Sequence, residues 1–113
     1  MSEEVEIYGF GSYFFGMKEY NDIDILIVHR SSNSESCRLA IMCKQYFVSN
    51  INDIDVTILS QHEERQISFV EVSSAKCLGK AKESCLESDL DEMLNLILSV
   101  RNYKDDVRRT QKT

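Results

Sequence analysis

The segment GFGSYFFGMKEYNDIDILIV, residues 9–28, joins a glycine-containing loop to one of the most apolar runs of the chain. Asp22 and Asp24 stand at the start of that run, although an ionised carboxylate is costly to bury unless it is paired or bound to a metal ion. A loop of about ten residues separates them from a Gly-Ser pair, Gly11 and Ser12. A buried strand that begins with two carboxylates indicates a site that uses their charge.

The chain has 113 residues, which suffices for one domain with a single sheet and a few helices. Its net charge is −6, and no basic stripe crosses the first hundred residues, so a preformed groove for nucleic acid is not expected. The acidic balance is compatible with metal binding or with a positively charged partner. Lys and Arg gather after Val100, where they are interpreted as a solvated end.

The N-terminal residues show neither a basic region nor an apolar core of a signal peptide, and no apolar run is long enough to cross a membrane. The four cysteines lack CxxC spacing. They are interpreted as small buried hydrophobes or free thiols in a reducing compartment, and a zinc site is not expected. We therefore expect a cytoplasmic protein.

Hydrophobic periodicity and turn residues predict strands and helices along the whole chain. Ser32 and Glu35 fit a capping box that would start the first helix. Strands are expected at 5–8, 22–28, 54–59 and, as an edge strand, 76–78; helices are expected at about 32–48, 63–71 and 88–103, with a charged linker at 80–87.

The predicted helices differ in how much of their surface is apolar. The first has one apolar face, with Leu39, Met42, Cys43 and Tyr46. The last carries one stripe of Leu90, Met93, Leu94, Ile97 and Leu98 and a second stripe of Leu96, Val100 and Tyr103. Two stripes predict that this helix packs on its own domain by one side and on a second chain by the other. His29 and His62 are interpreted as surface residues.

Three aspartates are the candidate catalytic and metal-binding residues. Asp22 and Asp24 are two residues apart in a strand, so their side chains share a face. Asp55 begins another strand-like run between Ile54 and Val56. If the two strands are neighbours, three carboxylates meet at one end of the sheet, which suits divalent metal ions. Two such ions can bind a triphosphate and activate an attacking oxygen.

The Gly-Ser pair, the loop, the Asp-apolar-Asp-apolar run "NDIDILIV" and the later strand "DIDVTIL" resemble the polymerase-β-like nucleotidyltransferases, in particular their minimal (MNT) branch. The resemblance covers about residues 5–80. It implies an α+β fold, with a mixed sheet backed by helices. It also implies that Gly11 and Ser12 contact nucleotide phosphates and that Asp22 and Asp24 hold Mg²⁺ or Mn²⁺. Asp55 would be the third carboxylate, binding one metal ion and helping to deprotonate the nucleophile.

The match departs from the family pattern at three places. The helix that usually precedes the first strand in the family is not expected here, because four residues stand before Val5. Tyr13, Phe14 and Phe15 follow the Gly-Ser pair where family members often carry a basic or small residue, so Lys18 is the nearby candidate for a charged phosphate contact. Core packing or a partner contact is the expected use of the three aromatic residues. Asp53 competes with Asp55 for the third position. Asp55 is preferred because it has apolar neighbours on both sides.

Two classes of function follow from this resemblance. The first is an enzyme that moves a nucleoside monophosphate, with AMP from ATP as the expected case, onto a hydroxyl of a partner protein or an RNA end. It would serve as the antitoxin of a HEPN/MNT-type prokaryotic toxin–antitoxin or defence system. The alternative is a weak or inactive antitoxin-like module that acts by protein contact. Residues 1–80 would form the nucleotidyltransferase domain. Residues 81–113 would form a C-terminal helix and basic tail that pack on it, on a HEPN-like toxin or on a second copy.

Overall fold

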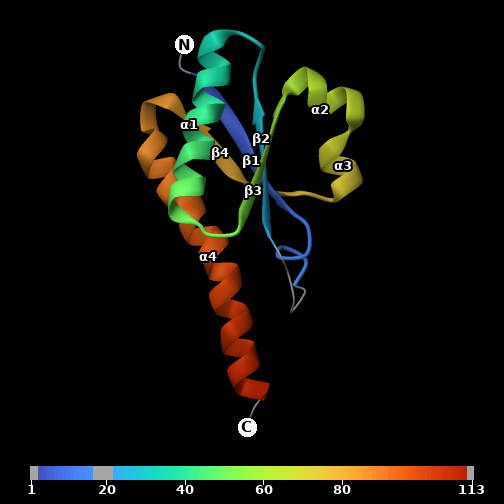
Figure 1. Ribbon diagram of the computed structural model, residues 1–113, viewed down its shortest axis with the longest axis vertical. Coiled ribbons are helices and arrows are strands. Elements are labelled where there is room, and N and C mark those ends of the chain that lie inside the picture. The colour runs from blue at the N-terminus through green and yellow to red at the C-terminus, as the bar shows by residue number, and fades with distance from the viewer. Residues whose placement is uncertain (1–2, 17–21, 112–113) are drawn as a thin grey trace.

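The computed structural model describes residues 3–16 and 22–111, with side chains described through residue 100. Within these residues the chain folds into a mixed four-stranded sheet with helices on both faces, so the expected α+β class is confirmed (Figure 1). The elements in order are β1 (Glu4–Phe10), β2 (Ile23–His29), α1 (Ser34–Asn50), β3 (Ile54–Ser60), α2 (Gln61–Ile67), α3 (Phe69–Ser73), β4 (Lys76–Lys82), the 3-10 turn η1 (Glu83–Cys85) and α4 (Leu86–Gln111).

The sheet has the strand order β3-β2-β1-β4. β1 runs antiparallel to both β2 and β4, whereas β2 and β3 are parallel. A parallel pair needs a crossover, and α1 provides it between β2 and β3. β2 is therefore an inner strand with helices over both faces, which explains why its sequence is apolar without alternation.

The hydrophobic core lies between one face of the sheet and helices α1 and α4. Ile7, Ile25 and Ile27 point into it from the sheet. The thiol of Cys43 is buried in this core, and burial raises its pKa to about 12, so it is a packing residue rather than a reactive thiol. The helices contribute Leu39, Ala40, Cys43 and Phe47 from α1 and Leu90, Met93 and Ile97 from α4.

The aromatic run after the Gly-Ser pair anchors the loop to this core. Tyr13 and Phe14 are buried, and the Tyr13 hydroxyl donates a hydrogen bond to the carbonyl of Ile97 in α4. The Phe14 ring lies so close to Gly9 that a Cβ there would be 2.5 Å from it, which only glycine permits. Core packing, expected for these aromatics, holds for Tyr13 and Phe14, while Phe15 is 47% exposed.

Helix α1 begins one residue later than the capping box predicts. Asn33, not Ser32, is the N-cap, and its side-chain oxygen accepts the Ser36 backbone N–H at 2.8 Å. The expected apolar face is also rotated, because Met42 is 45% exposed while Phe47 is fully buried. Ser36 is also buried on this side of α1: its hydroxyl accepts the Ser31 N–H and lies 3.1 Å from His29 Nδ1, which holds the first turn of α1 to the end of β2.

The expectation that His29 is a surface residue is wrong, whereas His62 is exposed as predicted. His29 is only 5% exposed at the end of β2. Its Nδ1 lies 2.8 Å from the Ser31 carbonyl oxygen and 3.1 Å from the Ser36 hydroxyl. Donation to the carbonyl places the proton on Nδ1. The ring therefore ties β2, the following turn and α1 together.

The second half of the chain differs from the prediction in two respects. The expected helix at 63–71 is two short helices, because Ser68 adopts a left-handed conformation with φ 50° and ends α2. The expected linker at 80–87 is absent from these described residues: β4 continues to Lys82, η1 follows, and α4 already starts at Leu86. Pairing with β1 extends β4, since Ala81 lies opposite Val5. The edge position of β4 is as predicted.

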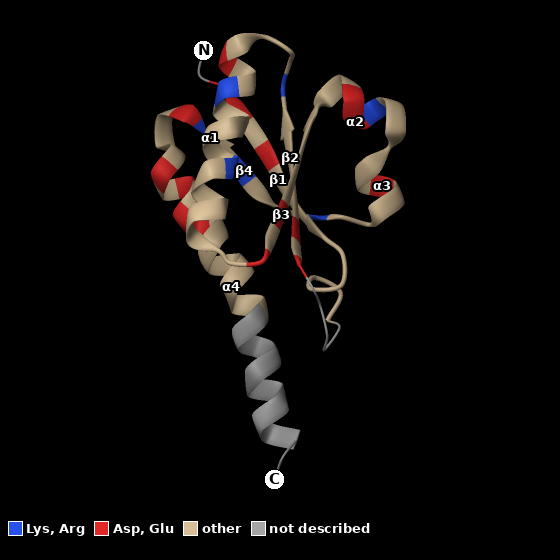
Figure 2. Ribbon diagram, in the orientation of Figure 1, with Lys and Arg blue, Asp and Glu red and all other residues tan. Residues whose placement is uncertain are grey.

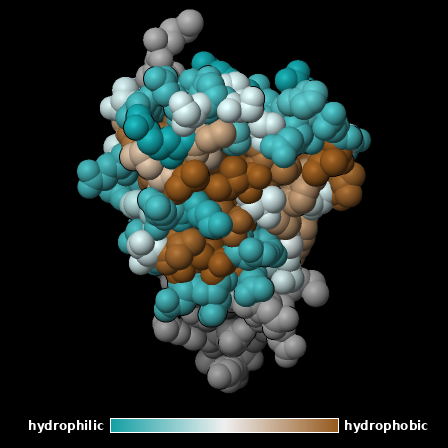
Figure 3. All heavy atoms as spheres, turned by 45° about the horizontal axis from the view of Figure 1, so that its top comes forward, coloured by the Kyte–Doolittle hydropathy of each residue, from teal (hydrophilic) through white to brown (hydrophobic). Residues whose placement is uncertain are grey.

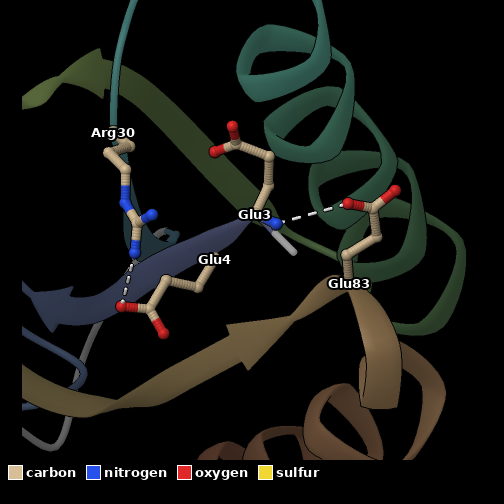
Figure 4. Close-up of polar contacts among 4 residues, drawn as sticks. All are labelled: Glu3, Glu4, Arg30 and Glu83. Carbon is tan, nitrogen blue, oxygen red and sulfur yellow. Dashed lines mark hydrogen bonds and ion pairs between the residues drawn. The ribbon is translucent and has the colours of Figure 1, made fainter. Parts of the chain in front are cut away.

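Polar contacts close the N-terminal end of β1 (Figure 4). The Glu3 backbone N–H donates to Glu83 at 3.3 Å, and Arg30 forms an ion pair with Glu4 at 3.2 Å. Both contacts are exposed or half-buried, so each contributes little to stability.

The stripes of α4 divide differently from the prediction. Leu90, Met93 and Ile97 are buried as expected for the first stripe. Val100, assigned to the second stripe, instead packs at the edge of the core, and Leu96 is 50% exposed. The side chain of Tyr103 lies outside the described residues, as does Lys18. Among the described helices, none combines the length and apolar character that a membrane crossing requires.

Candidate carboxylate site

Two of the predicted aspartates are direct neighbours across the sheet. Asp24 in β2 is the register partner of Asp55 in β3. Partners on parallel strands share a face, and adjacent strands lie about 4.8 Å apart. Asp22 stands one residue before β2 and is exposed. Acidic residues accordingly mark the ends of β2 and β3 that lie side by side in Figure 2. The condition on which the predicted carboxylate cluster depended, that the two strands are neighbours, is met.

Among residues 3–16 and 22–100, no cation forms an ion pair with the carboxylates at this edge of the sheet. The pKa of Asp24 is raised, first by burial and then by the negative charges of Asp55 and Asp22. In residues 3–16 and 22–100, Arg30 with Glu4 is the one ion pair, and it lies elsewhere. A carboxylate in this position is stabilised by any cation that binds beside it.

The Gly-Ser turn lies against the same carboxylate. Gly11 follows Phe10, which pairs with Asp24 across β1 and β2. Its φ is +80°, a conformation that glycine adopts without strain. A Cβ at Gly11 would be 2.3 Å from Asp24 Oδ2, so the backbone and the carboxylate touch only because there is no side chain. The turn and the carboxylate pair form one site, with Ser12 half-buried next to it.

The predicted convergence of all three carboxylates is not found. In the part of the chain that the structure describes, no group of three or more His, Cys, Asp or Glu side chains is arranged to hold a metal ion. Asp24 and Asp55 are register partners, whereas Asp22 lies one residue before β2. The side chains of Asp22 and Asp55 are both exposed, and that of Asp24 is half-buried. Mg²⁺ often takes only one or two protein carboxylates and completes its shell with substrate phosphates and water. A two-carboxylate edge is therefore still a suitable starting point for such an ion.

Asp53 has a different environment from Asp55. It lies in the turn before β3 with φ 60°, which Asp tolerates better than most residues. Its backbone carbonyl accepts the Ile23 N–H at 2.7 Å, so the residue holds the turn to the start of β2. Asp55, and not Asp53, is the register partner of Asp24. The geometry favours Asp55 as the third carboxylate.

Sequence reasoning missed Lys76, a cation beside the Gly-Ser loop. Its Nζ donates to the Phe14 carbonyl at 3.2 Å and lies 5.7 Å from the centre of the Phe15 ring. Lys76 arrives there because β4 pairs with β1, placing Lys76 opposite Gly9. No local pattern in the sequence indicates this contact, because the two partners are 62 residues apart.

A cleft opens on the sheet face that Asp24 shares with Leu26 and Val28, under helices α2 and α3. Its volume is about 450 Å³. Tyr8 lines this cleft. Burial, and the hydrogen bond that the Tyr8 hydroxyl donates to Glu6 at 2.8 Å, raise the pKa of Tyr8, so the phenol stays neutral. The lining residues are Glu6, Tyr8, Val28, Gln61, Glu64, Arg65 and Val70.

Comparison of the chain with protein-family models, with curated protein sequences and with solved structures found no match. The paired aspartates, the turn of Gly11 against Asp24 and the cleft on the same face are therefore the basis for assigning a function.

Proposed function

We propose that this protein is a metal-dependent nucleotidyltransferase of the polymerase-β-like superfamily, of the minimal type. It would move a nucleoside monophosphate, AMP from ATP in the first instance, onto a hydroxyl group. The observation that carries the proposal is the juxtaposition of Asp24 and Asp55 on adjacent strands with the glycine turn pressed against Asp24. A cation-binding edge and closely approaching backbone N–H groups are two features that together hold the phosphates of a nucleotide.

The donor set fits Mg²⁺ or Mn²⁺. Carboxylate oxygens are the ligands that these hard cations prefer, and the pair carries negative charge that no described side chain neutralises. Asp24 and Asp55 would hold the ion, with Asp22 joining from the residue before β2. A bound divalent cation would neutralise the phosphate charge and polarise the phosphorus.

Each residue of the turn and the pair has a defined task in this proposal. Gly11 lets the turn backbone approach the metal-binding edge at Asp24, and the Ser12 hydroxyl and N–H donate to phosphate oxygens held there. The acceptor hydroxyl oxygen attacks the α-phosphorus, and pyrophosphate leaves with the electron pair of the broken P–O bond. Asp55 accepts the proton of the hydroxyl. The cleft beside Tyr8 offers space for the nucleoside.

The acceptor belongs to another molecule in this proposal, because a domain of this size carries no separate recognition module. A HEPN-like toxin or an RNA end is the expected acceptor. A second candidate function is an antitoxin-like module that acts by contact alone. The exposed position of Asp22 and the lack of a three-carboxylate group in the described residues favour it.

Ligand-dependent melting tests the site without knowledge of the acceptor. A ligand that binds only the folded state raises the melting temperature. We expect millimolar Mg²⁺ or Mn²⁺ with ATP to raise it for the wild type, and Asp24→Asn or Asp55→Asn to abolish most of the rise. Asp53→Asn is the matched control and should keep it. Transfer of label from α-labelled ATP to a small helical protein encoded beside this one, or to RNA, then separates the enzyme from the contact module.

No metal-dependent rise for the wild type would overturn the nucleotide site. Equal damage by Asp53→Asn and Asp55→Asn would show that the third carboxylate is wrongly assigned. A rise without label transfer to either acceptor would favour the contact module.

A further inference from the structure

Charge is divided unevenly along this chain. Residues 101–113 contain five Lys or Arg and two Asp, a net +3 within the overall −6, so residues 1–100 carry −9. Such a division favours contact between the basic segment and an acidic surface. The basic segment has the sequence RNYKDDVRRTQKT, in which Tyr103 and Val107 stand one helical turn apart.

A groove with an apolar floor runs between α1 and the first turns of α4. It consists of two hollows of about 530 and 360 Å³ that share Met42 and Leu86. Tyr46 and Leu90 line the larger hollow, and Leu39 lines the smaller one. Apolar side chains open to solvent among hydrophilic ones are visible on the face drawn in Figure 3.

The rim of this groove is acidic. Glu35 and Glu83 border the smaller hollow, where Arg38 is the single cation of the lining, and Glu87 borders the larger one. Asp91 accepts a hydrogen bond from the Tyr46 hydroxyl at the same place. An apolar floor with an acidic rim matches a segment that combines Tyr and Val with Lys and Arg.

The segment cannot reach the groove of its own chain. α4 is one helix from Leu86 to Gln111, and a helix rises about 1.5 Å per residue. Tyr103 therefore stands about 25 Å along the axis from Leu86, at the end of α4 away from the groove. A second copy is the occupant that brings this sequence to the groove.

We propose that the protein forms a symmetric dimer in which residues 101–113 of each copy dock in the α1–α4 groove of the other. The contact is isologous, since each copy contributes one segment and one groove. Met42, which lines both hollows and is 45% exposed, is the apolar side chain on α1 that this arrangement would cover. The dimer is independent of the carboxylate pair and of the proposed nucleotidyl transfer.

Charge exchange tests the proposal. The segment variant carries Arg108→Glu and Arg109→Glu, and the groove variant carries Glu83→Lys and Glu87→Lys. Sedimentation of the full chain at micromolar concentration should give a dimer for the wild type, with a dissociation constant raised roughly tenfold or more in either variant. All four changes in one chain, or an equimolar mixture of the two variants, should restore the dimer. Glu71→Lys, on α3, is the matched control and should leave it unchanged.

Three results would overturn the proposal. They are a monomeric wild type at 100 µM, a dimer that both variants leave intact, and a mixture of the variants that stays monomeric while circular dichroism shows both to be folded. Restoration in the mixture supports the proposal. Each variant alone pairs a segment and a groove of like charge, so attraction can return only between the two different chains.

Discussion

Replacing Gly11 with alanine tests the contact between the glycine turn and Asp24. Gly11 has φ +80°, and its Cβ would stand 2.3 Å from Asp24 Oδ2. Gly16 provides the matched control, because its φ is +77° and a Cβ there would meet nothing within 4 Å. Both substitutions impose the same backbone strain, but only Gly11→Ala displaces the carboxylate.

The two effects have different magnitudes and different readouts. A left-handed alanine costs about 1–2 kcal/mol, so both variants should lose that much stability, or roughly 4–8 °C in Tm for each kcal/mol. The carboxylate is the end of a flexible side chain and can swing away, so the clash itself adds little to the loss. Displacement of the Asp24 carboxylate should instead weaken the binding of Mg²⁺ and ATP. A ligand at a hundred times its Kd stabilises the folded state by about 2.7 kcal/mol, and Gly11→Ala should lose most of this.

Differential scanning fluorimetry with and without Mg²⁺ and ATP measures both quantities in one experiment. We expect equal melting temperatures for Gly11→Ala and Gly16→Ala without ligand, and a ligand-induced rise only in Gly16→Ala. If both variants keep the full rise, Gly11 does not control the position of Asp24 and the reasoning fails. If both lose it, the effect comes from the loop as a whole and not from the contact.

Three further outcomes follow from single contacts. The folded-state pKa of Asp24 is raised, so ionised Asp24 destabilises the fold. Without divalent ions, Asp24→Asn should therefore be more stable than the wild type at pH 7. Urea titrations should show this stability gain shrinking as the pH falls through the folded-state pKa toward the ordinary value of 3.8. In the same urea assay, Asn33→Ala should lower the free energy of unfolding by about 1 kcal/mol, and Ser32→Ala by much less, because Asn33 is the N-cap of α1. Equal losses of stability in the two variants would contradict this assignment. Tyr13→Phe should cost about 1 kcal/mol by leaving the Ile97 carbonyl without its hydroxyl donor, and an unchanged urea midpoint would refute that.

The residues of the carboxylate pair were recognisable before the fold was known. Asp24 and Asp55 each stand at the start of an apolar run, and a carboxylate there is costly unless it has a task. The apolar runs also located β2 and β3 to within one residue. β2 is apolar throughout because it is buried on both faces, whereas β3 is a half-buried edge strand whose β-forming residues marked it. Strand identity is a local consequence of such patterns, whereas the α+β class was implied by the family resemblance.

Pairing and burial were decided by tertiary structure. The sequence did not indicate that His29 is buried against Ser36, because a histidine at a strand end is equally compatible with solvent. It placed β4 three residues long, whereas the ladder with β1 extends it to Lys82. The exposed position of Asp22 likewise depends on where β2 begins in the sheet.

The sequence by itself located β1, β2, α1 and β3 to within two residues, and it showed which carboxylates are out of place in an apolar frame. Only the tertiary structure decided that Asp24 and Asp55 stand side by side, that Gly11 presses on Asp24 and that Lys76 reaches the loop. The physical reason is range: periodicity and capping act within a few residues, whereas strand register joins residues far apart and is fixed only when the whole sheet buries its apolar face.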